Sequence, residues 1–343
     1  MIWGRSGYDG GMGESRNTTV EVGDQGLARE LSGQLELPEL VLGEEIETGS
    51  EGGGRQGVYQ GDVGKGRVGA AAVWLKRYHE AREKGDLSPE KRARDEIDVR
   101  LFLIRNGVDG VVKPESELVA TTADGGVWAA FNYEREMIPL FEMWKECIQF
   151  VDKGLDEGNP IYLMLVKMAK IHKLRSEKGE GVVLHDRHWG NMGMNDGKVM
   201  VGDLEFAQMI ADKGKLIGGQ SEDVAFLVAS IVVGTEVGKM REEAIAVDEE
   251  EKLRGRVVEE KPVDGVEVRR RIEGLLKATK ERDLIDEVKR AYEFGGGVGV
   301  DREQLRARVK ENVERILTED FGLGIEKPGL MKRVWRRMRG GNG

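Results

Sequence analysis

The sequence contains, in one order along the chain, each kind of group that transfer of a phosphoryl group requires. Such transfer depends on backbone that approaches the phosphates, a cation that neutralises them, oxygen ligands for Mg²⁺ and a carboxylate near the acceptor hydroxyl. The candidates are the glycine run Gly52–Gly57, Lys76, Asp186, Asn191 and Asp203. Their types and their order predict phosphotransfer chemistry with ATP and Mg²⁺ as cofactors.

The strongest of these signals lies in the segments LHDRHWGN and VGDLEF. Asp186 and Asn191 are five residues apart, and Asp203 follows twelve residues later, after an apolar strand. The spacing resembles the catalytic loop H-R-D-x-x-x-x-N of the protein-kinase-like superfamily, and the resemblance covers about residues 39–235. It implies that Asp186 orients or deprotonates the acceptor hydroxyl and that Asn191 and Asp203 hold Mg²⁺. The competing interpretation is a β-hairpin with incidental surface acids.

The glycine run between two predicted strands resembles the loop with which kinases cover the phosphates. Its residues match G-x-G-x-x-G, and the following Val58-Tyr59-Gln60-Gly61 is similar to the V-Y-x-G of that loop. The resemblance implies nucleotide-binding roles for Gly52, Gly54, Gly57 and Val58. Val58 directly follows Gly57, where kinases have one intervening residue, and a flexible hairpin without function is the alternative. A Rossmann loop is excluded because a strand follows, not a helix.

A third segment, Val73-Trp74-Leu75-Lys76, is similar to the kinase V-A-I-K and ends a predicted strand. The resemblance implies that Lys76 contacts the α- and β-phosphates. Its expected partner is Glu96, in a helix that begins at Ser88, and the two residues together form part of the predicted catalytic set. Asp98 is the alternative partner. An ordinary strand-end lysine and a solvated helix acid remain the competing interpretation.

The chain departs from the kinase pattern at four places. Trp74 stands where kinases have a small residue against the adenine, so the indole either narrows the site or turns away at a β-bulge. Leu184 replaces the usual histidine two residues before Asp186, and Asp203-Leu204-Glu205 replaces D-F-G. Only twenty residues separate Asp203 from Asp223, which leaves no room for a long activation segment. These departures indicate an atypical branch of the superfamily.

Different features resemble different atypical branches. The short activation segment and the helix around Glu96 look like RIO-type kinases. Asp203-Leu204-Glu205 resembles aminoglycoside and choline phosphotransferases, and Asp186-Arg187-His188-x-x-Asn191 resembles phosphatidylinositol kinases. Among the remaining candidates for chemistry, His79 and His172 are expected to be structural, and Cys147 is given no role. Arg187 and His188 are candidates for substrate-side or phosphate-side groups, and a packed structural histidine is the competing interpretation for His188.

The hydrophobic pattern predicts an α+β protein with the two-lobed architecture of kinases. Strands are expected at ELVLGEEIETG, from VYQG, at VGAAAVWLKRY and at VWAAFNY, with one helix from Ser88 to Gly107 between the last two. Later segments predict helices at YLMLVKMAKIHKL and SEDVAFLVASIV, with short strands GVVLH and KVMVGDLEF between them. The predicted division is a disordered leader at 1–37, an N-lobe of antiparallel sheet plus helix at 38–138, a mainly helical C-lobe at 139–320 and a basic tail at 321–343.

Composition restricts the setting in which such a protein works. The 343 residues are 39% hydrophobic and 34% charged, with a net charge of −10. This balance gives no strong nucleic-acid signal. The longest nearly apolar stretch, Val224 to Val233, is shorter than the ~20 residues of a spanning helix. A single cysteine excludes an internal disulfide framework, and no secretory signal is evident. We therefore expect a cytoplasmic protein without a transmembrane segment, whose basic tail contacts an anionic surface or is merely solvated.

Three hypotheses about function follow. The first is an atypical Ser/Thr protein kinase that transfers the γ-phosphate of Mg-ATP to a protein substrate. The second is a small-molecule or lipid phosphotransferase on the same fold, motivated by Asp203-Leu204-Glu205. The third is a catalytically weak pseudokinase that acts as a binding module, motivated by Trp74 and the irregular glycine loop.

Overall fold

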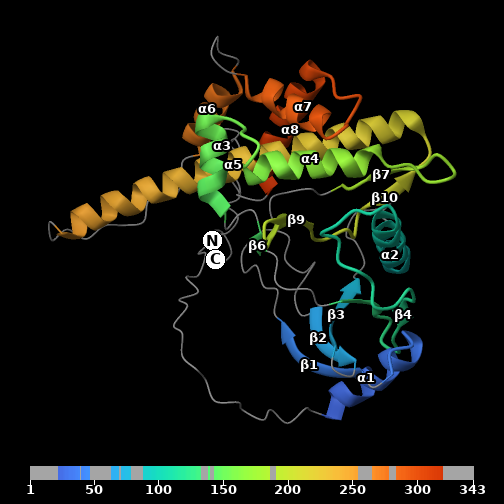
Figure 1. The fold of residues 1–343 in the computed structure, drawn as a ribbon. Coiled ribbons are helices and arrows are strands. Elements are labelled where there is room, and N and C mark those ends of the chain that lie inside the picture. Colours follow the sequence, from blue (N-terminus) through green and yellow to red (C-terminus); the bar gives the residue numbers. More distant parts are fainter. Residues whose placement is uncertain are drawn as a thin grey trace, which may run out of the picture.

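The structure is a computed structural model, and it contains both helices and antiparallel sheets (Figure 1). It describes residues 22–38, 40–46, 63–68, 71–78, 88–132, 138–139, 143–185, 191–253, 265–277 and 283–319. The predicted α+β class is therefore confirmed at the level of mixed helix and sheet. The predicted glycine loop and the predicted tail at 321–343 lie outside the described residues.

An antiparallel five-stranded sheet forms the N-terminal part, in the strand order β1-β2-β3-β5-β4. Two helices lie in this part, and each has its own apolar cluster with one set of alternate strand residues. Because successive side chains of a strand point to opposite faces, the two helices cover opposite faces of the sheet. The elements are α1 (Val22–Gln34), β1 (Leu40–Ile46), β2 (Val63–Val68), β3 (Ala71–Tyr78), α2 (Pro89–Arg105), β4 (Ala120–Thr121) and β5 (Val127–Asn132).

Helix α1 corrects the prediction that residues 1–37 form a disordered leader. Leu31 is fully buried in the cluster that α1 shares with β3 and β5. The Gln34 amide bonds both backbone groups of Thr121, accepting from the N–H at 2.8 Å and donating to the carbonyl at 2.9 Å. Three glycines within the helix lower its intrinsic propensity, so packing on the sheet stabilises it. Residues 1–21 lie outside the described part.

Helix α2 forms where the sequence predicts it. The hydroxyl of Ser88 accepts a hydrogen bond from the Lys91 N–H at 3.3 Å, and Pro89 occupies the first helical turn. The helix ends at Arg105, two residues before Gly107. The positive φ of Gly107 is a conformation that favours glycine. The predicted strands at ELVLGEEIETG, VGAAAVWLKRY and VWAAFNY are confirmed as β1, β3 and β5. The strand expected from Val58 is found as β2, which begins at Val63.

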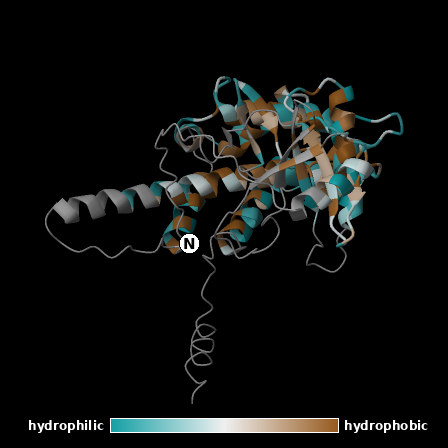
Figure 2. Ribbon diagram, turned by 90° about the horizontal axis from the view of Figure 1, so that it is seen from below, coloured by the Kyte–Doolittle hydropathy of each residue, from teal (hydrophilic) through white to brown (hydrophobic). Residues whose placement is uncertain are grey.

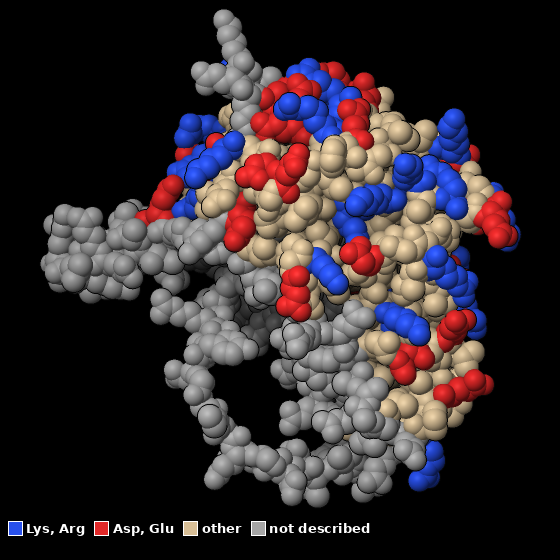
Figure 3. Space-filling model, viewed as in Figure 1, with Lys and Arg blue, Asp and Glu red and all other residues tan. Residues whose placement is uncertain are grey.

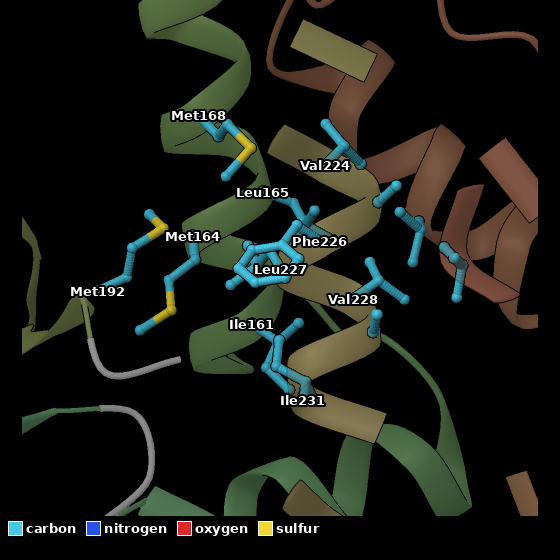
Figure 4. Packing of buried hydrophobic residues seen from close by; sticks show 14 of the residues in the cluster. Ile161, Met164, Leu165, Met168, Met192, Val224, Phe226, Leu227, Val228 and Ile231 are labelled. Atoms are coloured by element: carbon cyan, nitrogen blue, oxygen red, sulfur yellow. The ribbon is translucent and has the colours of Figure 1, made fainter. Parts of the chain in front are cut away.

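The rest of the described chain is mainly helical and surrounds two small sheets. Figure 4 shows α4 side chains Ile161, Met164, Leu165 and Met168 facing α5 side chains such as Leu227 and Ile231, in the largest hydrophobic core. The helices are α3 (Trp144–Lys153), α4 (Pro160–Lys173), α5 (Lys213–Leu253), α6 (Gly265–Leu276), α7 (Leu284–Phe294) and α8 (Arg302–Glu319). The strands are β6 (Ile138–Pro139), β8 (Met192–Asn195) and β9 (Lys198–Val201) in one sheet, and β7 (Gly181–Val183) and β10 (Gln208–Ile210) in the other.

Helix α5 is much longer than the segment that the sequence predicts. It contains 41 residues, and its C-terminal part extends past the neighbouring helices (Figure 1). Residues Lys213–Met240 are long and apolar enough to cross a membrane, but 72% of the most apolar window is buried within the protein. Buried core helices commonly have this composition. The ribbon coloured by hydropathy shows apolar residues concentrated where the helices meet (Figure 2).

The surface seen in Figure 3 carries acidic and basic side chains interspersed over both the sheet and the helical part. Some of the protein's charged side chains form i,i+4 pairs on one helix, such as Lys91 with Asp95 and Lys289 with Glu293. Exposed pairs of this kind contribute little to stability. The order of the fold therefore depends on the buried clusters and on the buried charges described below.

Replacing Leu31 with Ala tests the correction to the leader. The leucine is fully buried, and a buried Leu→Ala change costs about 2–5 kcal/mol of unfolding free energy. We expect urea unfolding to show a loss in that range for the sheet part. The exposed Arg29→Ala, on the same helix, is the control and should change stability by less than about 0.5 kcal/mol. Equal stability of both variants would show that α1 does not pack on the sheet.

Candidate active site

Lys76 lies where the sheet, α2 and the segment after β9 meet. Along β3 the alternation places Trp74, Lys76 and Tyr78 on the face toward α2. The Nζ atom of Lys76 lies 2.9 Å from Oε2 of Glu96 and 2.6 Å from Oδ1 of Asp203. It also lies 3.2 Å from Oε2 of Glu205. One ammonium thus joins three carboxylates, two of which come from a segment far along the chain.

Glu96 is the partner that the sequence predicts for Lys76, and the contact is confirmed. Its side chain is fully buried in α2. Besides Lys76 it accepts hydrogen bonds from the Tyr78 hydroxyl at 2.7 Å and from Arg100 Nη2 at 2.6 Å and Nε at 3.0 Å. Asp98, the alternative partner, is exposed on α2. Burial thus selects Glu96, because the two residues lie on different sides of the helix.

The charges of this cluster shift one another's pKa values. Burial alone would raise the pKa of Glu96, but Lys76 and Arg100 outweigh it and hold that pKa below its usual value. Burial alone would lower the pKa of Lys76, but Asp203 and Glu96 outweigh it and hold that pKa well above its usual value. Burial raises the pKa of Glu205, and the neighbouring Asp203 adds to the effect. Lys76 is therefore a fixed cation at neutral pH.

Two buried arginines of α2 complete the cluster, and the sequence analysis missed both. Arg100 Nη2 donates to the Gly202 carbonyl at 2.9 Å, and Arg92 Nη1 pairs with Glu205. They hold α2 against the segment that carries Asp203. The signal was present, since Arg92, Glu96 and Arg100 are spaced by four and share one helical face. Charged residues at that spacing are usually solvated, and only the fold shows that these are buried.

Asn191 and Asp203 flank the same end of the β8–β9 hairpin. Met192 pairs with Val201, and the Gly202 N–H donates to the Asn191 carbonyl at 2.9 Å. Asp203 is partly exposed, with a side-chain accessibility of 25%, and its Oδ1 also accepts the Glu205 N–H at 3.0 Å. Carboxylate and amide oxygens are ligands that Mg²⁺ accepts, usually with waters and substrate phosphates completing the shell.

These donor types fit Mg²⁺, although they do not form an all-protein metal cage. Within the described ranges, no group of three or more His, Cys, Asp and Glu side chains is arranged to hold a metal ion. A site built from one carboxylate and one amide would depend on oxygen ligands from a nucleotide. The pair Asn191 and Asp203 is therefore compatible with a metal that arrives together with phosphate groups.

Asp186 lies in the segment 186–190, which is outside the described residues. The predicted loop residues Gly52, Gly54, Gly57 and Val58 are also outside them. The residues on both sides of the segment 186–190 are described. The preceding His185 has a φ of +48°, in the left-handed region. Before it, the Leu184 N–H donates to Oδ2 of Asp223 at 2.7 Å. The chain therefore enters the predicted catalytic loop from a position fixed by α5.

A second α5 side chain fixes the same approach. The amide of Gln220 donates to the carbonyls of His172 and Val182, each at 2.9 Å. It thereby joins the end of α4 to β7. His172 is buried, with 2% exposure, as expected for a structural histidine. These contacts hold the end of α4 beside β7, the strand that leads to Leu184 and His185.

Trp74 lies on the same face of β3 as Lys76. Strand β3 pairs with β2 and β5 without a register shift, so β3 has no bulge that would turn the indole away. The side chain is half-buried and packs against the cluster of α2 and β5 that includes Tyr78 and Ile97. Two expectations were given for Trp74, a narrowed site or an indole turned away at a bulge. The regular pairing of β3 contradicts the bulge and leaves the indole on the lysine's face of the sheet.

Cys147 is buried, and burial together with the adjacent Glu146 raises the pKa of its thiol to about 12. A thiol with that pKa is a poor nucleophile at neutral pH.

A cavity of about 330 Å³ lies between α1 and the β4–β5 hairpin, lined by residues that include Leu27, Glu30 and Trp128. None of its lining residues belongs to the cluster around Lys76.

No family model matches the chain, and a search of curated proteins finds no match either.

The substitution Glu96→Gln tests the charge cluster. It keeps the side-chain shape and removes the charge that balances Lys76 and Arg100. Breaking a buried ion pair by removing one partner costs about 3–5 kcal/mol, and we expect a loss in that range in urea unfolding at pH 7.

Asp98→Asn, two residues away and exposed, is the matched control and should change stability by less than about 0.5 kcal/mol. Comparable effects of the two substitutions would contradict the assignment of Glu96 as the partner of Lys76.

Proposed function

We propose that this chain is a Mg-ATP-dependent phosphotransferase with the two-lobed architecture of protein kinases, and first an atypical Ser/Thr protein kinase. The observation that carries the proposal is the convergence of Lys76, Glu96 and Asp203. The Lys76 ammonium lies 2.9 Å from Glu96 and 2.6 Å from Asp203, and the contact with Glu96 was expected from the kinase resemblance. Mixed helix and sheet, with the lysine on the sheet and Asp203 after a hairpin of the helical part, supports the same architecture.

The roles of the residues follow from their charge and position. Lys76, fixed as a cation by its carboxylates, would bind the α- and β-phosphates. Glu96 holds the lysine in place, and Asn191 and Asp203 would hold the metal beside the phosphates. Mg-ATP, when bound, supplies the phosphoryl group and the cation that neutralises it. Asp186 would accept the proton of the acceptor hydroxyl, and Gly52, Gly54, Gly57 and Val58 would approach the phosphates from the glycine loop.

A specific observation favours a small-molecule acceptor as the second candidate. After Asp203 the chain forms the short strand β10 and enters α5 at Lys213, so only a short segment separates Asp203 from that helix. Glu205, the last residue of Asp203-Leu204-Glu205, is buried against Arg92 and Lys76. That triplet resembles aminoglycoside and choline phosphotransferases, whose acceptors are small alcohols.

Transfer of labelled phosphate from Mg-ATP tests the proposed activity. The protein should label itself, a protein substrate or one compound in a panel of amino alcohols, aminoglycosides, sugars and phosphoinositides. Asp203→Asn should lower the rate by about a hundred-fold or more, because it removes the carboxylate charge that would hold the metal beside the phosphates. Asp212→Asn, at an exposed position where the amide oxygen can still accept the Lys215 N–H, is the matched control and should leave the rate unchanged.

The pattern of results separates the hypotheses. Label on proteins alone supports the protein kinase, and label on a small alcohol supports the second candidate. A clear thermal stabilisation by Mg-ATP without transfer to any acceptor would leave a binding module, the function expected of a pseudokinase. Equal transfer by wild type and Asp203→Asn would contradict the proposed site.

A further inference from the structure

A chain of buried hydrogen bonds connects α7 to the segment that enters the predicted catalytic loop. The Leu184 N–H donates to Asp223 Oδ2 at 2.7 Å, and the same oxygen lies 3.0 Å from His172 Nε2. The other ring nitrogen, Nδ1, lies 2.7 Å from the Tyr292 hydroxyl. Tyr292 is fully buried, and it comes from a helix far beyond His172 in sequence.

The direction of these hydrogen bonds follows from the chemistry of the groups. As a carboxylate, Asp223 can only accept, so His172 must donate from Nε2. When the imidazole is neutral, its Nδ1 is an acceptor, and the Tyr292 hydroxyl donates to it. Burial, together with the charge of Asp223, raises the pKa of Tyr292. The hydroxyl therefore keeps the proton that the chain of hydrogen bonds requires.

The surroundings of Tyr292 fix its ring as well as its hydroxyl. The ring lies edge-on to His172, with centroids 5.8 Å apart. A Cβ atom at Gly297 would overlap the Tyr292 ring, and a Cβ at Gly295 would lie 2.6 Å from the Val166 carbonyl oxygen. The glycine stretch after α7 thus closes directly over Tyr292 and α4. This close approach requires glycine at both positions.

The segment that this chain of hydrogen bonds holds contains a residue in the left-handed region of backbone conformation. His185, directly after Leu184, has a φ of +48°. A non-glycine residue persists in that conformation when its surroundings fix it. Around Leu184 the fixing groups come from α5, through Asp223 and Gln220, from α4, through His172, and from α7, through Tyr292. The hydroxyl of Tyr292 is the last group of this chain of hydrogen bonds, counted from Leu184.

We propose that Tyr292 is a positioning residue, whose hydroxyl orients His172 and Asp223 and thereby fixes the backbone that leads into Asp186. The inference rests on the proposed function and deepens it. It gives α7 a role beside the site, since this helix then helps to fix Leu184, from which the chain continues toward the predicted catalytic loop. Tyr292 itself would touch neither nucleotide nor acceptor.

The substitution Tyr292→Phe removes the hydroxyl and keeps the ring that fills the core. Without the donor, Nδ1 of His172 is left buried without this partner, and the hold on Leu184 weakens. Hydrogen exchange measured by mass spectrometry should show exchange about ten-fold faster in the peptide that carries Leu184, with the β3 and α2 peptides unchanged. Tyr162→Phe, at a half-buried tyrosine of α4 whose ring contacts Phe294, should leave all peptides unchanged.

An activity measurement extends the test without replacing it. If the wild type transfers phosphate, Tyr292→Phe should lower kcat by about ten-fold and leave the KM for Mg-ATP unchanged. If the wild type transfers none, the proposed function fails, and the exchange comparison still decides whether Tyr292 positions this segment. Unchanged exchange at Leu184, equal acceleration across α4 and α5, or an unchanged kcat in an active enzyme would overturn the inference.

Discussion

The rest of the structure depends on the ion pairs that the largely buried ammonium of Lys76 makes with Glu96 and Asp203. A charge removed from water is costly unless opposite charges and hydrogen bonds surround it. Here Glu96 and Asp203 lie 2.9 Å and 2.6 Å from it, and Arg100 completes the coordination of Glu96. The sheet, α2 and the segment after β9 must therefore meet at one point. A fold that separated any of them would leave a buried charge without its partner.

The remaining elements can be understood as supports for that meeting point. Arg92 and Arg100 hold α2 to the segment of Asp203 and Glu205. Helix α1 covers the face of the sheet opposite α2, so that β3 is packed on both sides. The α4–α5 core carries Asp223, which fixes Leu184 at the entrance to the loop of Asp186. Arg92 and Arg100 thus limit where Asp203 lies relative to α2, and α1 limits where β3 and its Lys76 lie.

Local signals in the sequence predicted the elements near the site well. Ser88-Pro89 predicted the start of α2, and the spacing of Lys76 and Glu96 along the kinase pattern predicted their contact, which the structure contains. Helix α1 was missed because its glycines give the segment a low intrinsic helix propensity, and packing on the sheet stabilises the helix instead. Arg92 and Arg100 were missed because sequence alone does not distinguish a buried charged face from a solvated one. The network of Asp223, His172 and Tyr292 joins residues far apart in sequence, and no local pattern reports such contacts.

A crystal structure of the protein with Mg²⁺ and a non-hydrolysable ATP analogue tests the central claim most directly. The account predicts that the triphosphate lies within hydrogen-bonding distance of Lys76, that Glu96 still contacts that lysine, and that a carboxylate oxygen of Asp203 coordinates the metal. A nucleotide bound elsewhere, or an ordered triphosphate with Lys76 still held only by its three carboxylates, would contradict it.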